Sequence, residues 1–582
     1  MFYDFKVTIP DVTGKITKKK CGICVHILYE YERVYNKEKK YNIPKRAVIG
    51  KDAGDGKMYP NENFFKYFPS SDVVIPEVRP VAYRSSCLRA GCFVVIRKIV
   101  EEYKLEPILE RRIGEKWGLL LDLASYWIVE EDNASQYYPD YAYNHLLFSN
   151  GMRIFSDSTV SRFLCSVTDD HVIRFLDDWN RNRSKKDRIY ISYDSTNKNI
   201  QAGDVSFAEF GKAKEDESKP IFNLSVAYDR TNRVPLFYEE YPGSINDMSQ
   251  FTCMVDKAIE YGYRNIGFIL DRGYFCKDNI TYMDDNGFAF IMMVKGCQTL
   301  VSSLVMKHRH SFEDVRDCAI PAYDVYGTTT QEYLYEEDER KRWFHIYYSS
   351  YKAYAERDKL EKYIKRLSRW YASHEGQVVS LPKENKYFTF NFSKNGEFVA
   401  AHEKKDVISH ELSLCGYFCI VTSEKMDATE AIMLYKSRDI SEKLFTADKS
   451  FLGARSMRAH LDESVSTKLF IEFIALIIRN RIYSLLRRQM TELGRKSNHL
   501  TVPAAIRELE KIELVRRNEG IYRLDHALTR TQKEILSSFG ISEADFLKEV
   551  NELAGTLKDV KNDVTIDKGG EGDGENRIYQ GN

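Results

Sequence analysis

The sequence predicts an α/β fold built on one mixed β-sheet, and three observations support this prediction. Between about residues 188 and 298, three strand-like runs are followed by alternating helices and strands. Two aspartates follow apolar strands of this region. A helix far downstream, beginning near residue 427, can complete the same layer. With 582 residues the chain is too long for a single core, so further domains are expected around this sheet.

The first part of the predicted sheet consists of short runs with clear periodicity. RIYISYD alternates with a period of two, and IFNLSVAYD and VPLFYEEY are two further strands joined by the turn DRTNR. The helix NDMSQFTCMVDKAIEYGY, the strand NIGFILD, the helix CKDNITYMDDNG and the strand FAFIMMVK follow. This order is that of a ribonuclease H-like core that lacks its closing helix.

The closing helix is predicted after the strand GYFCIVTS. Asp427 and Glu430 have the spacing of a capping box, which marks a helix start. The run YKSRDISEKLFTADK then places Tyr435, Arg438, Glu442 and Lys449 on the chain. If the helix continues through Lys449, these four side chains project within about 60° of one another.

Charge and composition limit the classes of protein. Net charge is zero, which argues against a simple electrostatic binder of nucleic acid. Residues 15–50 and 471–500 are locally basic, and such segments are either solvated faces or contacts to phosphates. No apolar run is long enough for a membrane span and no secretory signal is seen, so a cytoplasmic protein without membrane partners is expected. Cys21 and Cys24 form half of a zinc motif without a second half, which favours ordinary reduced cysteines.

Three carboxylates are predicted to meet at one edge of the sheet. Asp194 is expected to end the first strand and Asp271 the fourth, and these strands are neighbours in a ribonuclease H-like sheet. Glu442 on the closing helix is expected to reach the same point. Carboxylates so close together require divalent cations, and hard oxygen ligands suit two Mg²⁺ or Mn²⁺ ions. An aspartate at a strand end is often only a turn residue, and Asp229, at the hairpin turn, is expected to be one.

The motifs YDSTN, GSINDMSQF and LDRGYF, followed by Y-x2-R-x3-E-x6-K, resemble those of bacterial insertion-sequence DDE transposases of the IS-four superfamily, close to the IS-sixteen-thirty-four group. The resemblance covers most of residues 40–550. It implies that Asp194, Asp271 and Glu442 bind two metal ions, while Tyr435, Arg438 and Lys449 contact DNA phosphates. It also implies a flipped base held by an aromatic side chain, for which Trp343 and Trp370 are candidates, although a tryptophan in an aromatic β subdomain is more often a core residue.

The function implied is cut-and-paste transposition by a homodimer, which binds the terminal inverted repeats in double-stranded DNA, cleaves the ends through a hairpin and joins them to target DNA. A ribonuclease H-like nuclease without strand transfer and a domesticated, non-catalytic DNA-binding protein remain alternatives. The predicted regions are a basic strand-rich part (1–75), a helical DNA-binding or docking part (76–185), the first part of the core (186–298), a mainly β insertion (299–415), the closing part of the core (416–490), a helical C-terminal unit (491–556) and a disordered tail (557–582).

Overall fold

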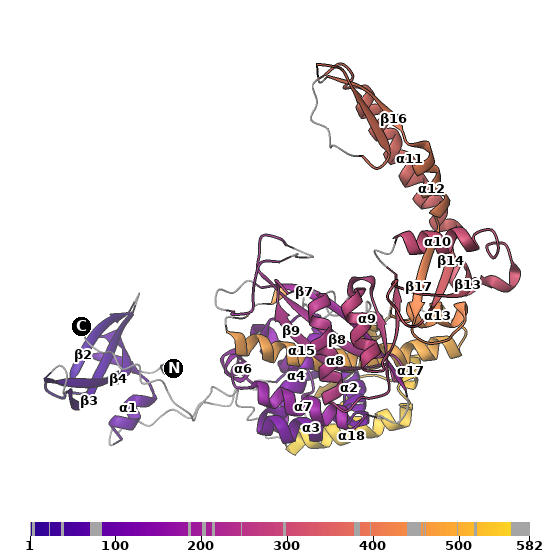
Figure 1. The fold of residues 1–582 in the computed structure, drawn as a ribbon. Coiled ribbons are helices and arrows are strands. Elements are labelled where there is room, and N and C mark those ends of the chain that lie inside the picture. Colours follow the sequence, from indigo (N-terminus) through magenta and orange to yellow (C-terminus); the bar gives the residue numbers. More distant parts are fainter. Residues whose placement is uncertain are drawn as a thin grey trace. The chain divides into compact units, whose positions relative to one another are not determined.

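The computed structural model divides the chain into two compact units, whose described residues lie before Tyr83 in the first and within Arg84–Lys561 in the second (Figure 1). The residues it describes are 2, 6–21, 24–36, 40–69, 84–183, 188–200, 205–211, 213, 216–245, 247–294, 298–377, 385–395, 397–438, 456–457, 459, 461–496, 499–516 and 521–559. The predicted tail therefore lies almost wholly outside the described residues, and only its first three residues are seen, as the end of a helix.

The N-terminal unit is a small antiparallel sheet, as the alternating sequence of this region predicts. Its strands run in the order β1-β5-β4-β3-β2. Their bounds are Val7–Thr8 (β1), Ile16–Cys21 (β2), Cys24–Asn36 (β3), Tyr41–Gly54 (β4) and Lys57–Pro60 (β5), and helix α1 spans Glu62–Tyr67. Ile27, Ile49 and Met58 are fully buried beneath α1 with Phe64. Cys21 and Cys24 face each other across the β2–β3 turn.

The second unit contains the predicted central sheet. Strands β7 (Ile189–Ile200), β8 (Ile221–Asp229), β9 (Val234–Pro242), β10 (Ile266–Leu270) and β11 (Ala289–Met293) lie in the order β9-β8-β7-β10-β11. The first three are antiparallel to one another, whereas β10 runs parallel to both β7 and β11. Helices α8 (Asp247–Glu260) and α9 (Lys277–Asp285) connect β9 to β10 and β10 to β11. The predicted order of elements and the predicted neighbourhood of the first and fourth strands are both confirmed.

The stretch 299–415 corrects the prediction of a mainly β insertion. Its strands β12 (Ala319–Ile320), β13 (Val325–Glu332) and β14 (Arg342–Tyr348) join the central sheet through β17 (Tyr417–Thr422), which pairs with β11. The remainder is largely helical, with α10 (Gln298–His308), α11 (Ser350–Ala372) and α12 (Lys405–Leu414) around the hairpin β15–β16 (Phe388–Phe392 and Phe398–Glu403). The alternating runs RWFHIYY and FTFNF do form strands. The local sequence could not show which sheet they join, because strand pairing across long sequence distances is not encoded locally.

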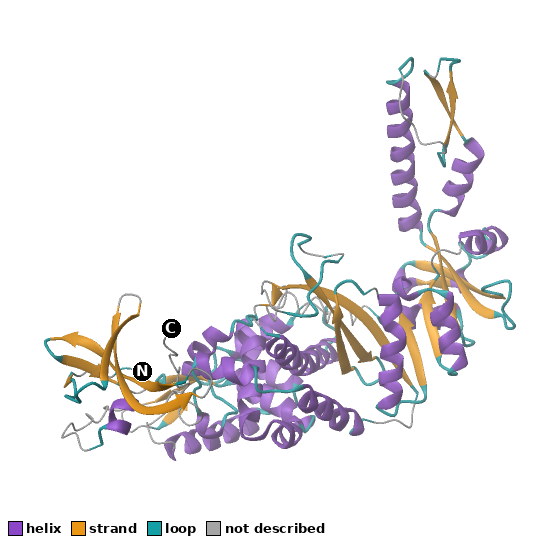
Figure 2. Ribbon diagram, turned by 60° about the vertical axis from the view of Figure 1, so that its left-hand side comes forward, coloured by secondary structure: helices purple, strands orange, loops and turns teal. Residues whose placement is uncertain are grey.

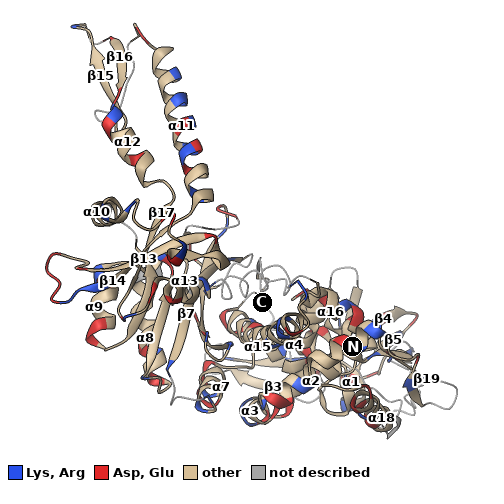
Figure 3. Cartoon of the chain, turned by 90° about the vertical axis from the view of Figure 1, so that its right-hand side faces the viewer, with Lys and Arg blue, Asp and Glu red and all other residues tan. Residues whose placement is uncertain are grey.

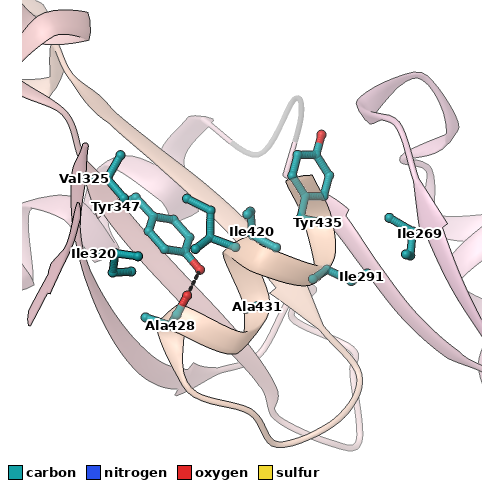
Figure 4. Packing of buried hydrophobic residues seen from close by; sticks show 10 residues of the cluster. Ile269, Ile291, Ile320, Val325, Tyr347, Ile420, Ala428, Ala431 and Tyr435 are labelled. Atoms are coloured by element: carbon teal, nitrogen blue, oxygen red, sulfur yellow. Dashed lines mark hydrogen bonds between the residues drawn. The ribbon is translucent and has the colours of Figure 1, made fainter. Parts of the chain in front are cut away.

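Helix α13 (Ala428–Lys436) is the predicted closing element, but it is shorter than expected. The Asp427 side chain accepts from the backbone N–H of Glu430, and the Glu430 side chain accepts from that of Asp427, so the predicted capping box is confirmed. The helix packs its buried face on the sheet around Ile291 and Ile420 (Figure 4). The helix ends at Lys436, one residue after Tyr435. The prediction of one continuous helix from Tyr435 through Lys449 is therefore wrong.

Helices cover the other end of the unit (Figure 2). The N-terminal ones are α2 (Gly91–Glu102), α3 (Leu105–Ile113), α4 (Trp117–Glu130), α5 (Tyr138–Asn144), α6 (Asp157–Leu164) and α7 (Asp169–Arg181). The C-terminal ones are α15 (Asp462–Glu492), α16 (Val502–Leu509), α17 (Arg530–Ser538) and α18 (Glu543–Asp559). The long α15 is buried along most of its length against α4 and β9. None of the described helices is long and apolar enough to cross a membrane.

The predicted C-terminal unit is joined to the helical region at the start of the second unit. Strand β6 (Cys87–Arg89) pairs with β19 (Glu513–Arg516), which pairs with β20 (Tyr522–Leu524). His145 and Arg89 both contact the carboxylate of Glu510. Residues more than 350 positions apart therefore form one layer, which chain order alone did not predict.

A buried histidine in the extended sheet gives a testable pH dependence of stability. His345 of β14 is fully buried, and its two ring nitrogens form hydrogen bonds with the hydroxyls of Thr329 (2.9 Å) and Thr422 (3.0 Å). Burial lowers the pKa of His345 to about 4. Below about pH 6.5 the unfolded chain binds a proton at this histidine, whereas the folded chain does not until the pH nears 4. The contribution of the neutral His345 to the free energy of unfolding is therefore complete above about pH 6.5 and is lost as the pH falls towards 4.

We expect the free energy of unfolding to fall by about 2 kcal/mol between pH 7 and pH 5 through this residue. Urea titrations at both pH values measure this decrease in the free energy of unfolding. In His345→Gln the decrease should be smaller than in the wild type by about 2 kcal/mol. An equal loss in both proteins would contradict the assignment to His345.

Candidate active site

Asp271 lies where the strand β10 ends, as predicted. It caps the short 3₁₀ turn Arg272–Tyr274, and its side chain accepts from the backbone N–H of Arg272 at 2.7 Å. The apolar strand before it is completely buried, whereas the carboxylate itself is 39% exposed. The strand therefore fixes the backbone, and the capped turn holds the carboxylate at the edge of the sheet within reach of solvent.

Asp194 is not at a strand end, which corrects the prediction. Strand β7 continues to Ile200, and Asp194 pairs with Val226 of β8. The pairing with β10, in contrast, ends at Tyr193, which lies opposite Leu270. The next residues on these parallel neighbours are Asp194 and Asp271, so their backbone positions lie side by side at the point where the two strands separate. Only the backbone of Asp194 is described.

The continuation of β7 was missed because it is polar. Residues 195–199, STNKN, resemble a loop in composition, yet each of them is less than 9% exposed. On the side from which β10 has departed, the short strand β18 (Ser456–Met457) pairs with Asn199 and Ile200 in parallel. Among the described residues, those between these two pairings have no strand neighbour on that side.

Arg438 contacts the second aspartate directly. It lies two residues beyond the end of α13, where its backbone N–H donates to the carbonyl of Tyr435 (3.1 Å). Its Nη1 is 2.7 Å from Oδ1 of Asp271, and the guanidinium lies over the Tyr435 ring, 5.6 Å from the ring centre. The guanidinium is only 13% exposed, so this ion pair is screened less than one on the surface. Three predicted site residues are thus brought together, although Arg438 is not on the helix.

Tyr435 is mainly a core residue. It is 4% exposed and belongs to the hydrophobic cluster between α13 and the sheet, with Ile269, Ile291 and Ile432. Figure 4 shows its hydroxyl pointing away from the Tyr347–Ala428 hydrogen bond. The Arg438 guanidinium lies over the ring of Tyr435. Because the ring is buried, only the hydroxyl of Tyr435 could contact a bound ligand.

A family model described as a transposase DDE domain matches residues 188–478, which is half of the chain. The chain belongs to this family. The matched region begins one residue before β7, contains both aspartates and the arm formed by α11, the hairpin β15–β16 and α12, and ends within α15. It is therefore a DDE transposase domain, and the family is one of enzymes that act on DNA with divalent metal ions.

Other comparisons add little to this assignment. A solved structure, described as a piggyBac transposase synaptic complex with hairpin DNA, is 9% identical in sequence, with a TM-score of 0.34 over 84% of this chain and 87% of that one. No curated protein matches the sequence.

Glu442, predicted as the third carboxylate, and the predicted phosphate contact Lys449 lie outside the described residues. The described residues on both sides of the segment that carries them contact the strands of the two aspartates. On its N-terminal side Arg438 contacts Asp271, and on its C-terminal side β18 pairs with the strand of Asp194.

The aromatic candidates differ in exposure. Trp343 lies within β14, opposite Thr422, with Lys425 near its ring, so its position is that of a sheet residue. Trp370, near the end of α11, is 42% exposed and stacks on His374. Asp229 has the expected turn role, because its carboxylate accepts from the backbone N–H groups of Thr231 and Asn232.

A buried ion pair behind the site was not predicted. Lys198 on β7 and Glu472 on α15 are 0% and 1% exposed, and their charged groups are in contact. Removing one partner of a pair so deeply buried typically costs about 3–5 kcal/mol. Four residues after Asp194, this pair ties the strand to the long buried helix.

The described side chains fit a cation at Asp271. Among the residues that the structure describes, no group of three or more His, Cys, Asp or Glu side chains is placed to hold a metal ion. One hard oxygen donor, Asp271, is present, and the guanidinium of Arg438 shows that positive charge is stabilised at its Oδ1. The position of Asp194 on the adjoining strand provides the place for a second oxygen donor.

Proposed function

We propose that the chain is a cut-and-paste DNA transposase of the insertion-sequence type, in which Asp194, Asp271 and Glu442 hold two Mg²⁺ ions, with Mn²⁺ as a substitute. The observation that carries this proposal is the convergence of Asp271 and Arg438 beside the backbone of Asp194. Two signature residues from parts of the chain more than 160 positions apart meet at 2.7 Å, as a shared site for metal and phosphate requires.

The reach of the chain supports Glu442 as the third ligand. Four peptide units separate it from Arg438, so its Cα lies at most about 14 Å from that of Arg438. Arg438 touches Asp271, and a glutamate side chain adds to this reach. This tether therefore allows Glu442 to reach the two aspartates.

In the proposed site the carboxylates bind the metal ions, and the other side chains bind DNA. Two bound divalent ions would activate a water or a 3′-hydroxyl and stabilise the leaving oxygen. Arg438 suits bidentate binding of a phosphate, and Lys449 suits a single charge contact. Tyr435 holds the Arg438 guanidinium over its ring and offers its hydroxyl to the same phosphate.

The proposed enzyme acts on bacterial chromosomal DNA in the cytoplasm as a homodimer that pairs two element ends, cleaves them through hairpins and joins them to a target. Incubation with Mg²⁺ and a duplex carrying the element end tests this. Nicked or hairpinned ends followed by joining are expected. Cleavage without end preference or joining would favour a general nuclease, and binding without cleavage would favour a domesticated DNA-binding protein.

Replacing Arg438 should change the affinity for metal and the affinity for DNA in opposite directions. A metal ion and the guanidinium compete for Oδ1 of Asp271, so Arg438→Gln should raise the affinity of the DNA-free protein for Mn²⁺ by roughly fivefold, the value of a modest ion pair. The same variant should bind end DNA more weakly, because a phosphate contact is lost. Mn²⁺ binding by electron paramagnetic resonance and DNA binding by anisotropy measure the two effects.

The matched control is Arg272→Gln. Arg272 adjoins Asp271, but its exposed side chain forms no described ion pair with that carboxylate. It should leave Mn²⁺ affinity almost unchanged. An equal rise in Mn²⁺ affinity in both variants, or no rise in Arg438→Gln, would show that Arg438 does not compete with the metal.

A further inference from the structure

Helix α11 leads away from the central sheet towards the end of the arm (Figures 1 and 3). It begins one residue after Ser349, which follows β14, and its 23 residues give a length of about 34 Å. One side of the helix is covered by the hairpin β15–β16 and by α12, where Ile364 and Tyr371 are buried with Phe388 and Phe398. The opposite side is exposed to solvent.

The exposed side is basic towards the end of the helix. Lys365, Arg366 and Arg369, which we call the basic face, are all exposed and lie three and four residues apart, so they share one face. No acidic residue occurs in α11 after Glu361. None of the three forms an ion pair with another described residue, whereas Lys362, one turn earlier, is paired with Asp358 at 2.7 Å.

Helix stability alone does not account for the basic face. A cation in the last turn is favoured by the helix dipole, which explains Arg369. Lys365 and Arg369 are like charges at i and i+4, however, and such a pair destabilises a helix by a few tenths of a kcal/mol. A polyanion lying along the face would remove this repulsion. Exposed Trp370 and Tyr363, the latter beneath the Arg366 guanidinium, flank the face with flat aromatic surfaces.

We propose that the basic face of α11 binds the sugar-phosphate backbone of duplex DNA, at a distance from the cleaved end. The charge of the face and the spacing of its cations on one helix are complementary to a row of phosphates. Because the face begins about 22 Å along the helix from its start, the duplex must extend beyond the catalytic site to reach it. The contact adds affinity without reading sequence. This inference rests on the proposed function only in its choice of DNA as the partner.

Salt dependence measures the number of phosphate contacts directly. Each contact contributes about 0.9 to the slope of log K against log salt concentration. For a duplex of about 30 base pairs, Lys365→Gln/Arg369→Gln should lower the magnitude of this slope by about 1.8 and weaken binding roughly tenfold at low salt. The change should be the same for an end sequence and an unrelated sequence, and smaller for a duplex of about 8 base pairs.

Lys386→Gln is the matched control, because it removes a cation from the same arm that Glu411 already holds at 2.7 Å. It should leave the slope unchanged. Glutamine is a good helix former, and circular dichroism verifies that α11 persists in the double variant. An unchanged slope in the double variant, or an equal change in the control, would overturn the proposal. If the wild-type protein shows the expected salt dependence but does not cleave a short end duplex, the proposed function is refuted while the inference about the basic face stands.

Discussion

Asp271→Asn is expected to abolish cleavage of end DNA while the protein still binds that DNA. Asparagine has the same shape and can still accept from the N–H of Arg272, so the capped turn after β10 is preserved. The negative charge that holds a divalent ion is lost, which should reduce the rate at least about 10³-fold, or about 4 kcal/mol in the barrier. Arg438 is released at the same time, so DNA binding should be equal or tighter.

Single-turnover cleavage and anisotropy on the same duplex separate the two effects. Asp229→Asn is the matched control, since Asp229 also ends a strand of this sheet and caps a turn through its carboxylate. It should cleave at nearly the normal rate. Cleavage by Asp271→Asn within tenfold of the wild type would remove Asp271 from the catalytic set.

Glu442→Gln is expected to have an effect of the same size. In the proposed site Glu442, which the short tether from Arg438 allows to reach the two aspartates, supplies the charge that completes the metal site. Cleavage should fall by about 10³-fold or more, and end binding should be spared because phosphates are held by Arg438 and Lys449. Glu442→Ala should behave in the same way.

The control for this variant is Glu430→Gln, at the start of the same closing segment. Glu430 accepts from the N–H of Asp427, a role that glutamine retains, so both folding and cleavage should be normal. If Glu442→Gln cleaves normally, the third ligand is a different residue and the tether from Arg438 does not bring Glu442 to the site.

The sequence predicted the elements whose signals are local. The buried strand before Asp271, the capping box of α13 and the order of the five core strands each rest on periodicity or capping within a few residues. The proximity of Asp271 and Arg438, which the sequence also predicted, is seen in their ion pair.

Features that depend on tertiary contacts were not predicted. The polar residues after Asp194 form a strand because their surroundings bury and pair them. Helix α13 stops at Lys436, and Arg438 reaches Asp271 from a turn instead of a helix face. The Lys198–Glu472 pair joins residues 274 positions apart and has no local signal, because either residue alone is typical of a solvated surface.

The central claim is that Asp194, Asp271 and Glu442 share one metal site. Iron-mediated backbone cleavage tests it most directly: the protein is loaded with Fe²⁺ in place of Mg²⁺, radicals are generated with ascorbate and peroxide, and the fragments are identified by mass spectrometry. Cuts near all three residues are predicted, and all should disappear with excess Mg²⁺ or in Asp271→Asn. Cuts near Asp194 and Asp271 without any near Glu442, or cuts that survive Asp271→Asn, would contradict the claim.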